Sequence, residues 1–171
     1  MEKFFISVYD AFDAAKQLFI DAGLKPILHI DKYRGQPVDP TQFEYFELPA
    51  LFIDWNTKWE RAGKKYNGTV NLEFHLLTDA TWSTSNISTD RVAGLKSVVY
   101  LTLVRHVLDR IKSDNTGPLM RAEDTPIETE VTNYHLLKYN APYYDPGSIN
   151  PDYIYVLIEQ LKLSGYLIDT L

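Results

Sequence analysis

The sequence predicts a single α+β domain in which one mixed or antiparallel sheet carries helices on one face. The chain has 171 residues, 45% of them hydrophobic, which is enough for one domain with a real core. Residues 68–77 alternate between apolar and polar side chains, as in a half-buried strand. Residues 2–22 and 89–113 instead repeat apolar side chains every three or four positions, as in amphipathic helices. The expected order is α-β-β-β-α-β-β.

Each element is placed by local signals. Gly23 stands where the first helix should end in a left-handed cap, and Ser88 or Thr89 can cap the second helix. The apolar stripe of the second helix is wide, so this helix is expected to pack on the sheet and on something else. For residues 126–140 a short helix is the alternative to a strand. The expected strands are 26–33, 50–56, 68–77, 126–140 and 152–163.

Long loops are expected at 34–49, 56–67 and 141–151 within the single domain spanning 1–171. The second of these is too long for an ordinary hairpin connection and is rich in aromatic and cationic side chains. Such loops often carry function. We therefore expect 56–67 to be mobile in the free subunit and ordered against a neighbour in an assembly.

Composition excludes several classes of function. The chain has no cysteine, which removes disulfides, thiolate metal sites and a cysteine nucleophile. Its net charge of −6 disfavours binding of DNA through phosphate neutralisation. No apolar run is long enough to span a bilayer, and Asp10 and Asp13 interrupt the apolar start, which argues against a signal peptide. No membrane partner is predicted.

The sequence predicts no catalytic residue, cofactor or metal site. Its four histidines lack metal-ligand spacing, and no nucleophile elbow or phosphate-binding glycine loop occurs. One enzymatic alternative is a metal-dependent nuclease of the PD-(D/E)xK type, whose core has a similar order of elements. Asp54 and Glu73 would then hold Mg²⁺, with His75 standing where that motif has lysine.

Aromatic residues point to protein contacts. They make up 13% of the chain, and Trp, Tyr and Arg are enriched at interface hot spots. For Trp55 the alternative is a place in the core. The residues predicted to make subunit or ring contacts are Trp55, Trp59, Arg61, Lys64, Lys65, Tyr66 and Trp82.

The layout resembles the neck or tail-completion proteins of tailed bacteriophages, of the tail-terminator type. The resemblance is carried by the strand Leu48-Pro49-Ala50-Leu51-Phe52-Ile53, the strand from Gly68 to Leu76, the helix opening at Ser88-Thr89-Asp90, and the closing strand from Tyr153 to Leu163. It implies a structural protein of the virion that forms a homo-oligomeric ring between portal and tail, as a tail terminator or head–tail connector. It also implies contacts with portal, neck or tail proteins, passage of genomic DNA through the ring, and assembly in the host cytoplasm.

Overall fold

The computed structural model describes residues 1–38, 46–62, 65–79, 91–127, 129 and 132–144. Within these ranges the chain forms one five-stranded mixed sheet with the strand order β1-β2-β3-β5-β4. The strands are β1 His29–Lys32, β2 Ala50–Ala62, β3 Lys65–Asp79, β4 Met120–Ile127 and β5 Thr132–Tyr143. The α+β class and the expected order of elements are confirmed. None of the helices in these ranges is long and apolar enough to cross a membrane.

The N-terminal segment forms two helices where the sequence predicts one. Helix α1 spans Glu2–Ala14 and helix α2 spans Lys16–Asp21, with Ala15 between them at φ −86° and ψ −2°. Gly23 follows in the left-handed region at φ 70°, as the sequence predicts, because glycine adopts this conformation without strain. The second predicted helix is likewise divided, into α3 Arg91–Gly94 and α4 Lys96–Leu108.

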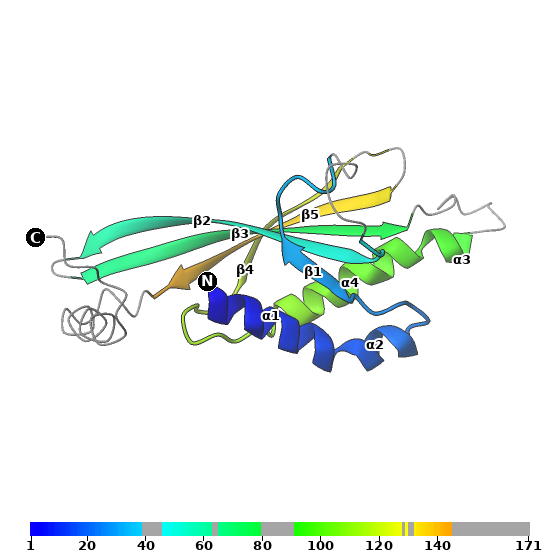
Figure 1. Cartoon of the computed structure of the whole chain (residues 1–171), viewed down its shortest axis with the longest axis horizontal. Helices are drawn as coiled ribbons and strands as arrows, with labels where there is room; N and C mark the ends of the chain where they lie inside the picture. Colours follow the sequence, from blue (N-terminus) through cyan, green and yellow to red (C-terminus); the bar gives the residue numbers. More distant parts are fainter. Residues whose placement is uncertain (39–45, 63–64, 80–90, 128, 130–131, 145–171) are drawn as a thin grey trace, which may run out of the picture.

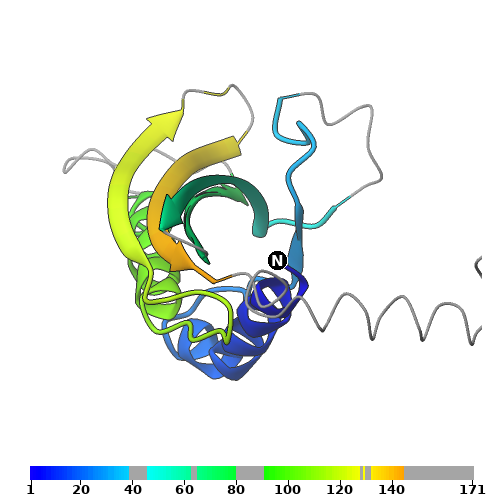
Figure 2. The same cartoon turned by 90° about the vertical axis from the view of Figure 1, so that its left-hand side faces the viewer.

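The helices cover one face of the sheet. Viewed along its long axis, the sheet is strongly curved, and α1, α2 and α4 lie together on one side of it (Figure 2). The main core fills the space between these layers and includes Phe4, Phe12, Val104, Leu72 and Phe74. On the helix-free face a smaller buried cluster consists of Ala50, Phe52, Leu77 and Tyr134.

Two expectations about the strands are corrected. The segment 56–67 is not a loop, because β2 continues to Ala62 and β3 already begins at Lys65. Their antiparallel register runs from Ala50 opposite Leu77 to Ala62 opposite Lys65. The expected strand over 126–140 is two antiparallel strands, β4 and β5, and β5 continues to Tyr143, into the expected 141–151 loop. The expected strand over 152–163 lies outside the described residues.

Candidate assembly interface

The β2–β3 hairpin extends beyond the helical layer. Figure 1 shows the paired ends of β2 and β3 projecting past the N-terminal end of α1. Side chains alternate across β2, so Thr57 and Trp59 continue the face that is covered by helices closer to the centre of the sheet. None of the described helices reaches this far, so the distal part of that face lies beyond the described helical layer.

Trp59 is held in place at this distal end although 44% of its surface is exposed. It lies opposite Gly68 on β3, and its ring meets the Tyr143 ring edge-on with centroids 5.7 Å apart. A Cβ atom on Gly68 would lie 2.8 Å from the Trp59 ring and 2.9 Å from the Tyr143 carbonyl oxygen. The missing side chain of Gly68 therefore makes room for the indole, which is an exposed anchor with a fixed position.

Trp55 has a different environment from Trp59. It is half-buried and meets the Phe5 ring of α1 edge-on, with centroids 5.4 Å apart. The Lys32 ammonium lies 4.9 Å from the centre of the indole, within range of a cation–π contact. Trp55 thus packs within the subunit, and its predicted role as a contact residue stays a prediction.

The other predicted contact residues are distributed along the hairpin or lie beyond the described residues. Arg61 is exposed at the end of β2, directly opposite Tyr66 of β3, and Lys65 begins β3. Lys64 and Trp82 fall outside the described residues. The structure thus brings Trp59, Arg61, Lys65 and Tyr66 to one end of the sheet. Gly68 and Tyr143 belong to this arrangement too, and a glycine inside an alternating strand is the signal that could have indicated them.

A second set of exposed apolar side chains lies on α3 and the start of α4. Val92, Leu95, Val98 and Val99 are all exposed, whereas Ser97, Tyr100, Leu101 and Val104 form the buried face of α4. Val92 is the most open of the four, with 73% of its surface exposed. We call these four residues the α3–α4 apolar patch. The sequence predicts a helix that contacts more than the sheet, and this patch is the surface available for such a contact.

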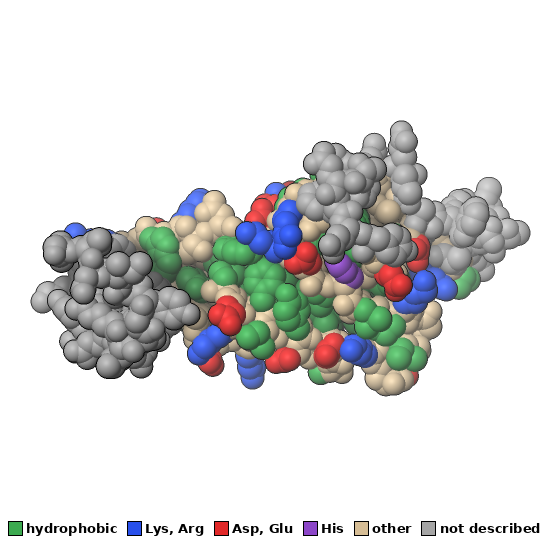
Figure 3. Space-filling model, in the orientation of Figure 1, with side chains coloured by type: hydrophobic (Ala, Val, Ile, Leu, Met, Phe, Trp, Pro, Cys, Tyr) green, Lys and Arg blue, Asp and Glu red, His purple; other side chains and the backbone are tan. Residues whose placement is uncertain are grey.

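The face that carries α1, α2 and β1 is mixed in character. Hydrophobic side chains lie there among lysines, arginines and acidic residues, and neither sign of charge forms a continuous field (Figure 3). The exposed apolar residues of these helices are Ile6, Tyr9, Leu18 and Ile20. This surface does not have the basic stripe that a nucleic-acid-binding face requires.

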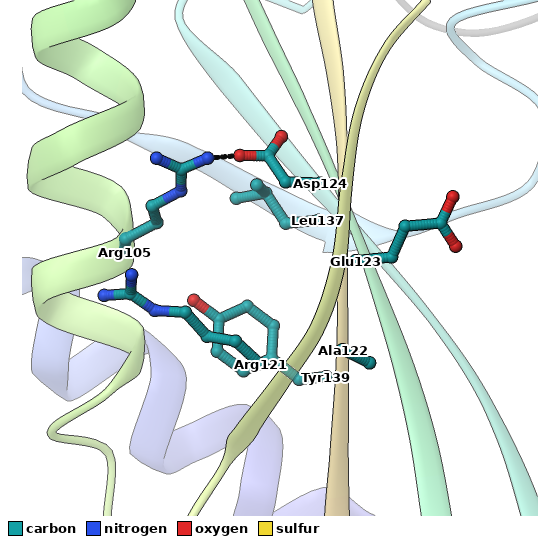
Figure 4. Close-up of a pocket in the computed structure, with 7 residues that line it drawn as sticks. All are labelled: Arg105, Arg121, Ala122, Glu123, Asp124, Leu137 and Tyr139. Carbon is teal, nitrogen blue, oxygen red and sulfur yellow. Dashed lines mark ion pairs between the residues drawn. The ribbon is translucent and has the colours of Figure 1, made fainter.

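A cavity of about 340 Å³ lies between α4 and the β4–β5 edge. Arg105 of α4 forms an ion pair with Asp124 of β4 (Figure 4). Arg121 of β4 pairs with Asp109, so both guanidinium groups are neutralised. Burial raises the pKa of the adjacent Tyr139 to about 12, which keeps its hydroxyl protonated at neutral pH. Both cations that line the cavity are paired with carboxylates, and these ion pairs join β4 to α4 and to the residue that follows it.

The residues of the nuclease alternative meet only in part. Asp54 and Glu73 lie directly opposite each other on β2 and β3, and Lys138 of β5 lies opposite Glu73. Asp54 accepts a hydrogen bond from the Trp55 backbone N–H at 2.8 Å. His75 is buried, and its Nδ1 atom lies 2.5 Å from the Tyr134 hydroxyl. Across the described part of the chain, no group of three or more His, Asp or Glu side chains is placed to hold a metal ion.

Comparisons with known proteins give little further guidance. No protein-family model matches the sequence, and no curated protein is found to be similar to it. Among solved structures, a chain of the "Virion of native gene transfer agent (GTA) particle" is similar, with a TM-score of 0.49 and 13% sequence identity. The match covers 81% of this chain and 92% of that chain. A likeness at this level identifies no function by itself.

Proposed function

We propose that this chain is a non-enzymatic structural subunit of a tailed-phage virion, forming an oligomeric ring in the neck or tail through which DNA passes. The observation that carries the proposal is the β2–β3 hairpin, which extends past the helices and presents Trp59 at its distal part. A two-stranded ribbon has little stability of its own in water. A ribbon that exposes a fixed tryptophan is well suited to contact another subunit.

The α3–α4 apolar patch supplies a second, different surface. Figure 1 shows α3 near one end of the long axis and the ends of the β2–β3 hairpin near the other. A ring requires a head-to-tail contact, in which two unlike patches on opposite sides of the subunit meet. A hairpin at one end and an apolar helix surface at the other fulfil that requirement. The resemblance of the sequence layout to tail-terminator proteins supports the same arrangement.

The charge balance fits a channel that does not retain DNA. The chain carries a net charge of −6, so a ring of many copies is acidic and repels the phosphate backbone overall. The partners in this proposal are further copies of the chain and the adjacent portal, neck or tail proteins. The subunit would be assembled in the host cytoplasm and retained in the virion neck or tail, either as a tail terminator or as a head–tail connector.

The proposal is tested by the mass of the purified protein, alone and mixed with portal, neck or tail proteins. Light scattering should show a defined oligomer in at least one condition, and a ring with a central channel should be visible by electron microscopy. Trp59→Ala combined with Tyr66→Ala should weaken this assembly and leave the circular dichroism of the subunit unchanged. A strict monomer that binds none of these partners would exclude a ring role.

A further inference from the structure

Among the described residues, no strand covers the outer edge of β2 along the hairpin. Strand β1 pairs with β2 only from Ala50 to Ile53, and no strand among the described residues pairs with that edge from Asp54 to Ala62. An unpaired strand edge presents backbone donors and acceptors that another strand can bind. This edge is therefore a place where a further strand can be added to the sheet.

The backbone groups that face outward can be identified. The Ile53 carbonyl oxygen accepts a hydrogen bond from Tyr33 N–H at 2.9 Å, on the β1 side of β2. Because alternate residues of a strand direct their backbone groups to the same side, Trp55, Thr57 and Trp59 also face this edge. The Trp55 N–H is satisfied by the Asp54 carboxylate, which leaves Thr57 and Trp59 as donors further along.

By contrast, the opposite edge of the sheet, formed by β4, is protected against pairing with another strand. Strand β4 has a register irregularity between Arg121 and Glu123, and it contains Pro126, which has no N–H to donate. Bulges and prolines are devices that discourage an edge strand from pairing with another chain. The part of β2 from Asp54 to Glu60, seven residues with no strand partner on this side in the described structure, has neither feature. Of these two edges, β2 is the one suited to strand addition.

We propose that this edge pairs in antiparallel fashion with the same edge of a second copy of the chain. When Trp59 lies opposite Trp59 of the second copy, Lys58 lies opposite the second copy's Glu60, and the two-fold axis repeats this pair. The neighbouring registers are unfavourable. One places Lys58 opposite Lys58, and the next places Asp54 opposite Glu60, so like charges would face each other. Neither Lys58 nor Glu60 forms an ion pair within the described part of the subunit, and both are exposed.

This contact differs from the ring contact proposed above and does not depend on it. A two-fold contact closes on itself, so it can join two subunits or two rings but cannot build a ring by itself. It would also cover part of Trp59 by placing two indoles opposite each other, which is a favourable cross-strand pair. The contact area is small, so we expect a reversible dimer whose population rises with protein concentration.

Charge exchange tests both the contact and its register. Lys58→Glu alone and Glu60→Lys alone each place like charges opposite each other twice, and each should weaken dimerisation by roughly tenfold. The double variant exchanges the two charges and should restore the wild-type dissociation constant in sedimentation velocity experiments. Lys112→Glu, an exposed change away from the edge, is the matched control and should have no effect. Single variants that do not weaken the dimer, or a double variant that does not restore it, would overturn the proposal.

A cross-link gives an independent readout because the chain has no cysteine of its own. In the proposed register Trp59→Cys lies opposite itself, with Cα atoms about 5.5 Å apart, which permits a disulfide. Thr57→Cys does not lie opposite itself and should give little cross-linked dimer under the same oxidant. Equal cross-linking of both variants, or a wild-type protein that stays monomeric at every concentration, would refute the pairing. A ring that persists in the charge-reversed variants would leave the proposed function intact and remove only this contact.

Discussion

His75 is buried on the helix-free face of the sheet, with only 4% of its surface exposed. Its ring stacks on Tyr33, with centroids 3.9 Å apart, and its Nδ1 atom shares a hydrogen bond with the Tyr134 hydroxyl. The Nε2 atom is buried and has no hydrogen-bond partner among the described residues. Burial lowers the pKa of His75 to about 4, an effect that the nearby Asp54 carboxylate partly opposes.

This environment predicts a loss of stability in mild acid. The pKa of His75 is about 4 in the folded chain and about 6.5 when unfolded, so the unfolded chain takes up the proton first as the pH falls. Between pH 7 and pH 5 the free energy of unfolding should fall by about 2 kcal/mol through this residue. Urea unfolding of His75→Gln should show a smaller decrease over that interval. His106→Gln, at an exposed position, should keep the full decrease, and equal slopes in all three proteins would contradict the assignment.

Gly68 is predicted to be intolerant of any side chain. A Cβ atom there would collide with the Trp59 ring and with a Tyr143 backbone oxygen, and the backbone oxygen cannot move without disturbing the strand pairing. Gly68→Ala should lower the free energy of unfolding by about 1–3 kcal/mol, as overpacking does. It should also displace the indole, visible as a fluorescence change that is absent when Trp59→Phe is already present. Asn67→Ala, next to it at an exposed position, should change stability by less than about 0.5 kcal/mol.

At the scale of elements, the sequence predicts the central part of the β2–β3 hairpin but not its distal end. The alternation from Val70 to Leu76 predicts the central part of β3 because one face of that part is buried. Beyond the described helices the hairpin is not packed in the described core, so the apolar alternation disappears although the strand pairing continues. The polar composition of residues 56–67 is therefore that of a loop, which is what the sequence predicts there.

The other differences between the elements expected from the sequence and those of the structure have similar causes. The strand β4 has no buried side chain, so periodicity could not reveal it, and only its last two residues fall within the strand expected over 126–140. In α4 both faces carry valine and leucine, so the pattern predicts the helix without deciding which face is buried. The face chosen by the fold contains Tyr100, whose hydroxyl donates to the Lys25 carbonyl oxygen 3.0 Å away. Contacts of this kind join residues that are distant in sequence and cannot be read from a local pattern.

The two tryptophans of β2 should separate folding from assembly. Trp55→Ala removes contacts with Phe5 of α1 and with Lys32 of β1, so it should lower the free energy of unfolding by about 2 kcal/mol, less than for a fully buried aromatic residue. Trp59→Ala loses mainly its contact with Tyr143 and should cost roughly half as much. Urea unfolding of the isolated subunits gives both values, and Trp55→Phe serves as the conservative control. An equal or larger loss for Trp59→Ala would place that residue in the core instead of an interface.

At the scale of the whole molecule, we expect no nuclease activity. The two carboxylates of Asp54 and Glu73 face each other across β2 and β3, but the third group of the motif would be His75, which is buried against Tyr33 and Tyr134. Purified protein with Mg²⁺ or Mn²⁺ should leave supercoiled and linear DNA and RNA uncut. Cleavage that disappears in Glu73→Gln and persists in Glu123→Gln would contradict the structural role and establish the enzymatic alternative.

The ring arrangement makes a distinct prediction for the α3–α4 apolar patch at the other end of the molecule. Val98→Glu adds a charge at a position with 51% of its surface exposed, so the subunit should keep its free energy of unfolding within about 0.5 kcal/mol. If the patch receives the hairpin of a neighbour, the buried charge should abolish the defined oligomer seen by light scattering.

Mixing this variant with the Trp59→Ala, Tyr66→Ala variant provides the decisive control. Each variant then retains one intact surface, so in a head-to-tail ring the two should form mixed dimers through the remaining pair of good surfaces. Two copies of either variant alone lack this pair of surfaces and can associate only through the edge of β2. An oligomer that survives Val98→Glu unchanged would show that this patch is not part of the contact.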